Sequence, residues 1–134
     1  MYYDLYIPMP TQATGTFEVK LAPQKDDSPI GRMTIDKQFH GDLEATSKGQ
    51  MLAFMTAVKG SAGYVAMEQV TGKLHAQEGT FVLQHNGTMK RGEPGLSVTV
   101  VSDSGTGALE GLSGTMEIIV AEGKHSYRFQ YSLS

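Results

Sequence analysis

Hydrophobic and polar residues alternate along most of this chain with the two-residue period of a β-strand. In residues 16–21, TFEVKL, the hydrophobic Phe17, Val19 and Leu21 are separated by polar neighbours. Successive side chains of a strand point to opposite faces, so one face of this segment is expected to be buried and the other solvated. The pattern predicts a half-buried strand near the start of the chain.

The same alternation marks a series of further segments. Residues 32–49 alternate on both sides of Gly41, and we predict one long strand that bends at this glycine. Residues 50–60 are apolar on nearly all sides and end in a turn signal, so they are predicted to form a strand of their own. The remaining predicted strands span residues 63–74, 79–89, 96–102, 114–120 and 125–133. About eight strands at this spacing are typical of an all-β barrel or sandwich.

Two turn signals lie close together after residue 85. Asn86-Gly87 is the dipeptide most typical of a two-residue hairpin, whereas residues 90–95, KRGEPG, contain two glycines and a proline. Only one of the two can be the tip of the hairpin. A turn at residues 90–95 leaves two strands of matched length, so we predict the turn there and place Asn86 and Gly87 in a β-bulge.

Composition and charge narrow the range of partners. The 134 residues suffice for one domain. The net charge is −3 and the 11 basic residues are scattered, which excludes the basic patch that a nucleic acid requires. No apolar run approaches the roughly 20 residues that cross a membrane, and the first residues lack the basic and apolar parts of a signal peptide. We therefore expect no nucleic acid, no membrane and a cytoplasmic protein.

The motifs of catalysis and cofactor binding are missing from the sequence. The glycines of residues 105–114 lack the strand and helix context of a dinucleotide fingerprint, and they are predicted to form a tight loop over Leu109 and Leu112. The four histidines stand on separate segments without metal-ligand spacing, and the chain has no cysteine. We predict no metal site and no cofactor.

Polar residues inside strongly apolar strands are the candidates for function. Glu68 shares a predicted strand face with Tyr64, and Glu44 lies between two hydrophobic residues. If Glu68 points into a barrel, burial is expected to raise the pKa of its carboxyl, which then needs a partner. The neighbouring strand offers Gln84 or His85, and the alternation sends only one of these two inward. The other reading is an ordinary solvated strand face.

A family resemblance rests on five blocks that occur in order between Ala13 and Met116. The blocks read ATGTFEVK, FHGDLEATS, GYVAMEQVTGKL, EGTFVLQHNGTM and SGTGALEGLSGTM. On these blocks the chain resembles an uncharacterised bacterial domain-of-unknown-function family (number 3224), whose members resemble the allene oxide cyclase barrel. The resemblance implies an all-β fold, an eight-stranded antiparallel barrel of the allene oxide cyclase-like (calycin-like) type. Residues 1–134 then form a single barrel domain, with residues 1–12 as an N-terminal extension.

The resemblance also implies a kind of function. Allene oxide cyclases and the similar dirigent proteins hold small apolar molecules inside the barrel and are often trimers. Our leading hypothesis is therefore a barrel that binds a small apolar ligand, within a homo-oligomer that is a dimer or trimer. Its candidate ligand-binding residues are Glu68, Glu44, Gln84, His85 and Tyr64. Two alternatives stay open, an isomerase- or cyclase-type enzyme that uses a buried carboxyl and a filled barrel that acts only as a structural or interaction module.

Overall fold

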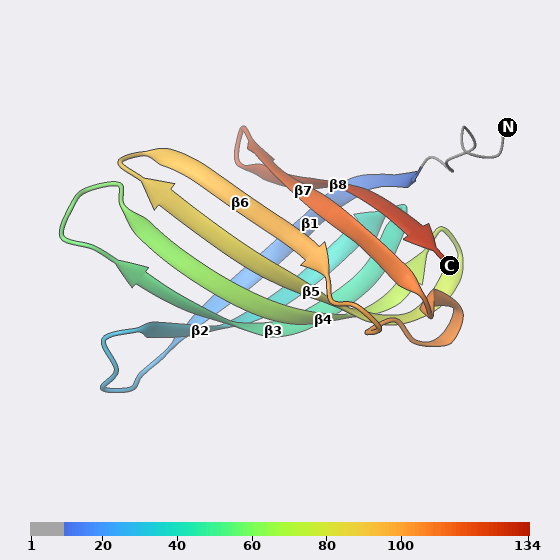
Figure 1. Cartoon of the computed structure of the whole chain (residues 1–134), viewed down its shortest axis with the longest axis horizontal. Helices are drawn as coiled ribbons and strands as arrows, with labels where there is room; N and C mark the ends of the chain where they lie inside the picture. Colours follow the sequence, from blue (N-terminus) through green and yellow to red (C-terminus); the bar gives the residue numbers. More distant parts are fainter. Residues whose placement is uncertain (1–9) are drawn as a thin grey trace, which may run out of the picture.

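Eight antiparallel strands close into one barrel in the computed structural model, which describes residues 10–134 (Figure 1). The strands are β1 (Thr11–Gln24), β2 (Gly31–Gly41), β3 (Leu43–Met55), β4 (Ala62–Leu74), β5 (Gln77–Lys90), β6 (Glu93–Val100), β7 (Leu112–Ala121) and β8 (Lys124–Leu133). Each strand pairs with the next along the chain, and β1 pairs with β8. The all-β barrel predicted from the alternation and the resemblance is confirmed.

The ends of the chain and the connections add little regular structure. A short 3-10 helix, η2 (Gly107–Leu109), precedes β7. Within residues 10–134, no helix is long and apolar enough to cross a membrane. Of the predicted N-terminal extension, residues 1–9 lie outside the described residues, and Thr11 and Gln12 already belong to β1.

The long bent strand predicted over residues 32–49 is wrong. The chain reverses at Gly41 and Asp42, so that β2 and β3 form a hairpin in which Phe39 pairs with Ala45. Gly41 has a φ of +109°, and a Cβ there would lie 2.7 Å from the carbonyl oxygen of Thr14. Glycine therefore permits a sharp reversal where the pattern indicated only a bend. Residues 50–55, predicted to begin a separate strand, continue β3, and the total of eight strands is unchanged.

The region after residue 85 combines a confirmed and a wrong prediction. The hairpin between β5 and β6 turns at Arg91 and Gly92, inside the predicted segment. Asn86 and Gly87 are not in a bulge, because both pair in regular register with β4 and β6. Gly87 instead accommodates an aromatic ring, since a Cβ there would collide with the ring of Tyr64.

Side chains fill only one half of the barrel interior. This filled half lies at the end of the barrel that carries the C-terminus (Figure 1). Its fully buried core includes Phe39, Leu43, Leu74, Phe81, Leu83, Leu109, Leu112 and Phe129. The rings of Phe81 and Phe129 stack with centroids 5.9 Å apart. Leu109 and Leu112 are buried beneath the glycine-rich loop, as predicted from the sequence.

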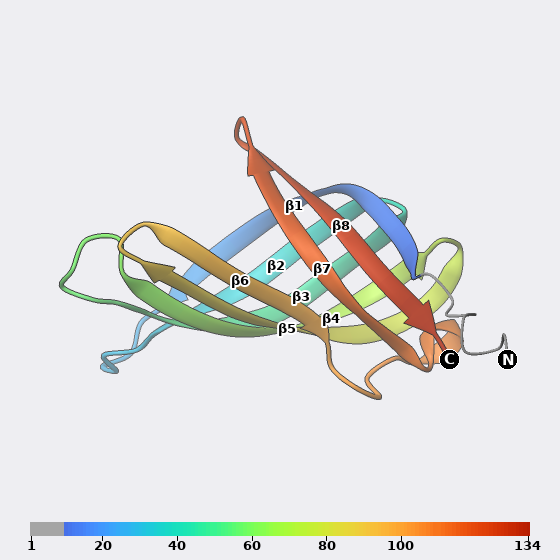
Figure 2. The same cartoon turned by 45° about the horizontal axis from the view of Figure 1, so that its top comes forward.

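The barrel is closed unevenly around its circumference. β4 and β5 pair along the whole of Ala62–Leu74, whereas the pairing of β6 with β7 consists of Thr99 and Thr115 among the described residues. The β7–β8 hairpin diverges from β6 at the end opposite the C-terminus (Figure 2). We call this junction the β6–β7 seam. Backbone groups on the two sides of the seam lack the ladder that holds the other strands together.

Candidate functional site

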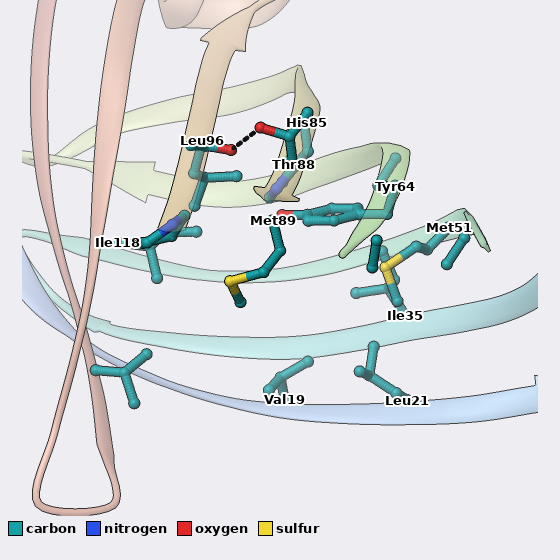
Figure 3. Close-up of a pocket in the computed structure, with 18 of the residues that line it drawn as sticks. Val19, Leu21, Ile35, Met51, Tyr64, His85, Thr88, Met89, Leu96 and Ile118 are labelled. Carbon is teal, nitrogen blue, oxygen red and sulfur yellow. Dashed lines mark hydrogen bonds between the residues drawn. The ribbon is translucent and has the colours of Figure 1, made fainter. Parts of the chain in front are cut away.

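A cavity of about 530 Å³ occupies the other half of the barrel, which we call the hollow half. All eight strands contribute to its lining. The lining residues include Phe17, Val19, Leu21, Ile35, Met51, Ala53, Tyr64, Ala66, His85, Met89, Leu96, Ile118, Val120 and His125. In Figure 3 the side chains of Val19, Leu21, Ile35, Tyr64 and Met89 converge on a common space.

Small residues create this space. Inward positions of β4 and β5 carry Ala66 and Gly87 in the hollow half, where the filled half has Phe81 and Leu74. The inward-facing Ala53 of β3 follows the same pattern. The strand geometry is the same in both halves, so the cavity follows from side-chain volume and not from a change of fold.

A buried polar layer separates the two halves. It consists of Lys37 from β2, Ser47 from β3, Glu68 from β4 and His85 from β5, and each of these residues is at most 6% exposed. Glu68 Oε1 accepts hydrogen bonds from Lys37 Nζ and His85 Nε2, both at 3.0 Å. Glu68 Oε2 accepts a hydrogen bond from Ser47 Oγ at 2.9 Å. Three donors therefore converge on one carboxylate, which satisfies both of its oxygens.

The surroundings of Glu68 keep its carboxyl ionised. Burial favours the neutral acid, but the hydrogen bond from His85 and the positive charge of Lys37 outweigh it, so that the pKa of Glu68 lies below its ordinary value. The raised pKa expected from the sequence is therefore wrong. That expectation considered burial alone, without an ammonium group 3.0 Å away.

Tyr64 of β4 lies beside the polar layer, on the side of the cavity. Its ring centroid lies 6.3 Å from that of His85, and the residue lines the cavity. Burial raises the pKa of the Tyr64 hydroxyl, and the negative charge of Glu68 raises it further. The phenol is therefore neutral at physiological pH and available as a hydrogen-bond donor.

Two of the predicted site residues point away from the cavity. Gln84 is exposed on the outer face of β5, because His85 next to it points inward. Glu44 is exposed on the outer face of β3 and accepts a hydrogen bond of 2.7 Å from the backbone N–H of Gly41. Neither residue contributes to the cavity, because each sits on the outward phase of the alternation.

Two members of the polar layer were not predicted. Lys37 lies between Ile35 and Phe39 on the inward phase of β2, so the alternation does mark it as an inward lysine. Ser47 follows Ala45 on the inward phase of β3. The signal was therefore present in the period-two pattern. What it lacks is the information that the inward lysine faces Glu68.

The described residues give no support to a metal site. Between residues 10 and 134, no group of three or more His, Cys, Asp or Glu side chains is arranged to hold a metal ion. In the polar layer, the two oxygens of Glu68 are already used by Lys37, His85 and Ser47. The layer thus offers hydrogen-bond donors and a neutralised charge to a cavity occupant, and not a set of metal ligands.

Comparison with known proteins agrees with the resemblance carried by the five sequence blocks. Residues 13–131 match the family described as "Protein of unknown function (DUF3224)". The chain is also similar to a protein of unknown function from the DUF3224 family of Shewanella oneidensis MR-1, known from its crystal structure. The two share 50% sequence identity and a TM-score of 0.90, over 93% of this chain and 98% of the other. Among proteins with a curated description, none matches. The chain belongs to the DUF3224 family.

Proposed function

We propose that this protein binds a small, mainly apolar molecule in the hollow half of its barrel. The observation that carries the proposal is the cavity of about 530 Å³, lined by apolar side chains and bounded on its inner side by the buried polar layer. Ligand sites in proteins have volumes of roughly 300–1,000 Å³ and combine an apolar lining with a few polar groups. Transfer of apolar surface from water supplies the affinity, and the polar layer orients the ligand.

The lining suits an adaptable site. Met51, Met55 and Met89 contribute flexible, polarisable side chains, which adjust to ligands of different outline at little cost. The β6–β7 seam borders the same space, because Leu96 and Ile118 line the cavity from its two sides. The lining residues Met55 and Val120 are 83% and 64% exposed, so the cavity is open to solvent at its rim and a ligand can enter without opening the barrel wall.

A cavity-filling substitution tests the proposal. N-phenyl-1-naphthylamine, a neutral probe that fluoresces in apolar surroundings, serves as the ligand. Ala66→Phe places a ring inside the cavity, and we expect probe affinity to fall at least about tenfold, equal to about 1.4 kcal/mol. Gln69→Phe adds the same ring to the exposed outer face of β4 and is expected to leave the affinity unchanged.

Two further results keep this test decisive. Circular dichroism establishes that each variant is folded, and Ala53→Phe replaces Ala66→Phe if the latter is not, because Ala53 lines the cavity on β3. No probe binding to the wild type, or an equal loss in the Gln69→Phe protein, would overturn the proposal, since either result means that the interior of the barrel is not the binding site.

A further inference from the structure

The polar layer presents more hydrogen-bond donors than Glu68 uses. The ammonium group of Lys37 has three N–H donors, and one of them bonds to Glu68 Oε1 at 3.0 Å. The hydrogen bonds of the described residues give this ammonium no second acceptor. Its Nζ lies 4.9 Å from the ring centroid of Phe17, and Phe17 itself lines the cavity. The ring centroid of Phe39 lies 5.7 Å from the same Nζ, and these two aromatic faces attract the cation without supplying an oxygen acceptor for its remaining N–H donors.

The charges around the cavity determine what kind of oxygen fits. The titratable groups that line the cavity or adjoin it in the polar layer are Lys37, Tyr64, Glu68, His85 and His125. The positive charge of Lys37 is balanced by the ionised Glu68 at 3.0 Å. A ligand carboxylate would place a second negative charge beside Glu68 in a site of low dielectric, which is costly unless a further cation compensates it. A neutral oxygen atom of the ligand can accept a hydrogen bond from Lys37 without adding a charge beside Glu68.

The position of the donor defines the orientation of the ligand. Lys37 belongs to the layer that closes the inner side of the cavity, next to the filled half. Along the same strand faces toward the other end of the barrel, the lining consists of Ile35, Met51 and Leu21. A ligand with a hydrogen-bond acceptor at its inner end and a hydrocarbon body toward the other end of the barrel therefore matches the cavity.

We propose that the ligand is a neutral apolar molecule with an acceptor oxygen, such as a carbonyl, at one end, and that it binds oxygen-first with this oxygen accepting a hydrogen bond from Lys37 Nζ. This inference rests on the proposed function and names the ligand class for the same cavity. Tyr64, with its neutral hydroxyl beside the path of the ligand, is a further donor for the same oxygen.

Three matched eight-carbon compounds test the ligand class by displacement of N-phenyl-1-naphthylamine at pH 8. They are 2-octanone, octane and octanoate, which differ in the presence and charge of the terminal oxygen group. We call the ratio of the affinity of 2-octanone to that of octane the ketone preference, because octane has the larger apolar surface and the two affinities are not directly comparable. We expect removal of the Lys37 donor to lower this ratio at least about tenfold, the size of one hydrogen bond from a charged donor. Octanoate is expected to bind more weakly than 2-octanone because of the repulsion from Glu68.

Substitution of Lys37 tests whether the N–H donor of this residue accounts for the binding of the ketone. Lys37→Met should lower the ketone preference by this factor while octane still binds. Because this change leaves Glu68 without its counter-charge, the double variant Lys37→Met/Glu68→Gln provides a neutral layer and should give the same result. Lys48→Met, on a lysine whose side chain is 84% exposed on β3, serves as the matched control and should keep the ketone preference.

The outcomes separate this inference from the proposed function. If no compound displaces the probe and the probe itself does not bind, the proposed function fails. If octanoate binds most tightly, or if the ketone preference survives in both Lys37 variants, the neutral ligand class or the assigned donor is wrong.

Discussion

The filled and hollow halves of this barrel are built from the same strands with the same inward and outward alternation, yet only one of them has a packed core. Inward positions of the filled half carry Phe39, Phe81 and Phe129, whereas the hollow half has Ala66 and Gly87 at comparable positions of the strands. Alternation therefore determines which side chains face inward, and side-chain volume determines whether they meet. Packing of one half supports the fold, which leaves the other half free to hold a ligand.

The boundary between the halves is as informative as the halves themselves. A charged layer in the middle of an apolar interior costs free energy unless every group is paired, and Glu68 receives three hydrogen bonds there. Such a layer contributes little to stability compared with apolar residues of equal size. Its position at the inner end of the cavity supports the proposal that the layer orients a ligand.

The largest expected effect contrasts one substitution in each half. Phe81→Ala should lower the free energy of unfolding by about 3–5 kcal/mol, because it removes a fully buried ring that stacks on Phe129. Met51→Ala in the hollow half should cost less than about 1.5 kcal/mol, since its neighbours already border empty space. Urea unfolding followed by circular dichroism measures both. Equal losses would mean that the hollow half is packed in solution.

The polar layer should give the barrel an acid-sensitive component. The folded-state pKa of Glu68 lies below its ordinary value of 4.5, so its charge stabilises the barrel fully above that value. This contribution is lost as the pH falls through the folded-state pKa. At pH 7 we expect Glu68→Gln to lower the free energy of unfolding by about 3 kcal/mol, because Lys37 stays buried without its counter-charge.

The effect of pH on the stability lost in Glu68→Gln is the measurement that identifies the role of the charge. The gap in the free energy of unfolding between wild type and Glu68→Gln should be largest at pH 7 and should shrink steadily from pH 5 toward pH 3. Asp36→Asn, at an exposed acid that pairs with Lys48 on the outer face, is the matched control and should show a much smaller gap. A gap for Glu68→Gln that is independent of pH would show that hydrogen bonding, and not charge, accounts for its effect.

The sequence predicts contacts between strands that are neighbours along the chain better than contacts between strands that are further apart along it. The two-residue period puts Tyr64 and Glu68 on one strand face and allows only one of Gln84 and His85 to face inward, without deciding which. In the structure His85 faces inward and reaches Glu68 from the neighbouring strand, where it pairs with Ala66. The meeting of Lys37 with Glu68 depends on two registers, that of β2 with β3, which the reversal at Gly41 sets, and that of β3 with β4. A pattern with period two carries direction but not register, so the partner of Glu68 and the depth of the cavity required the folded structure.

The smallest expected effect concerns the adjacent pair Gln84 and His85, whose side chains lie on opposite faces of β5. Gln84→Ala should change the free energy of unfolding by no more than about 0.5 kcal/mol and should leave probe binding unchanged, because the side chain is exposed. His85→Ala should cost about 1–3 kcal/mol, because it removes a donor from a buried carboxylate. Urea unfolding and probe titration on the same two proteins compare the faces directly. If Gln84→Ala lowered the affinity for the probe, the probe would have to contact the outer face of β5. The hollow half would then not be the binding site.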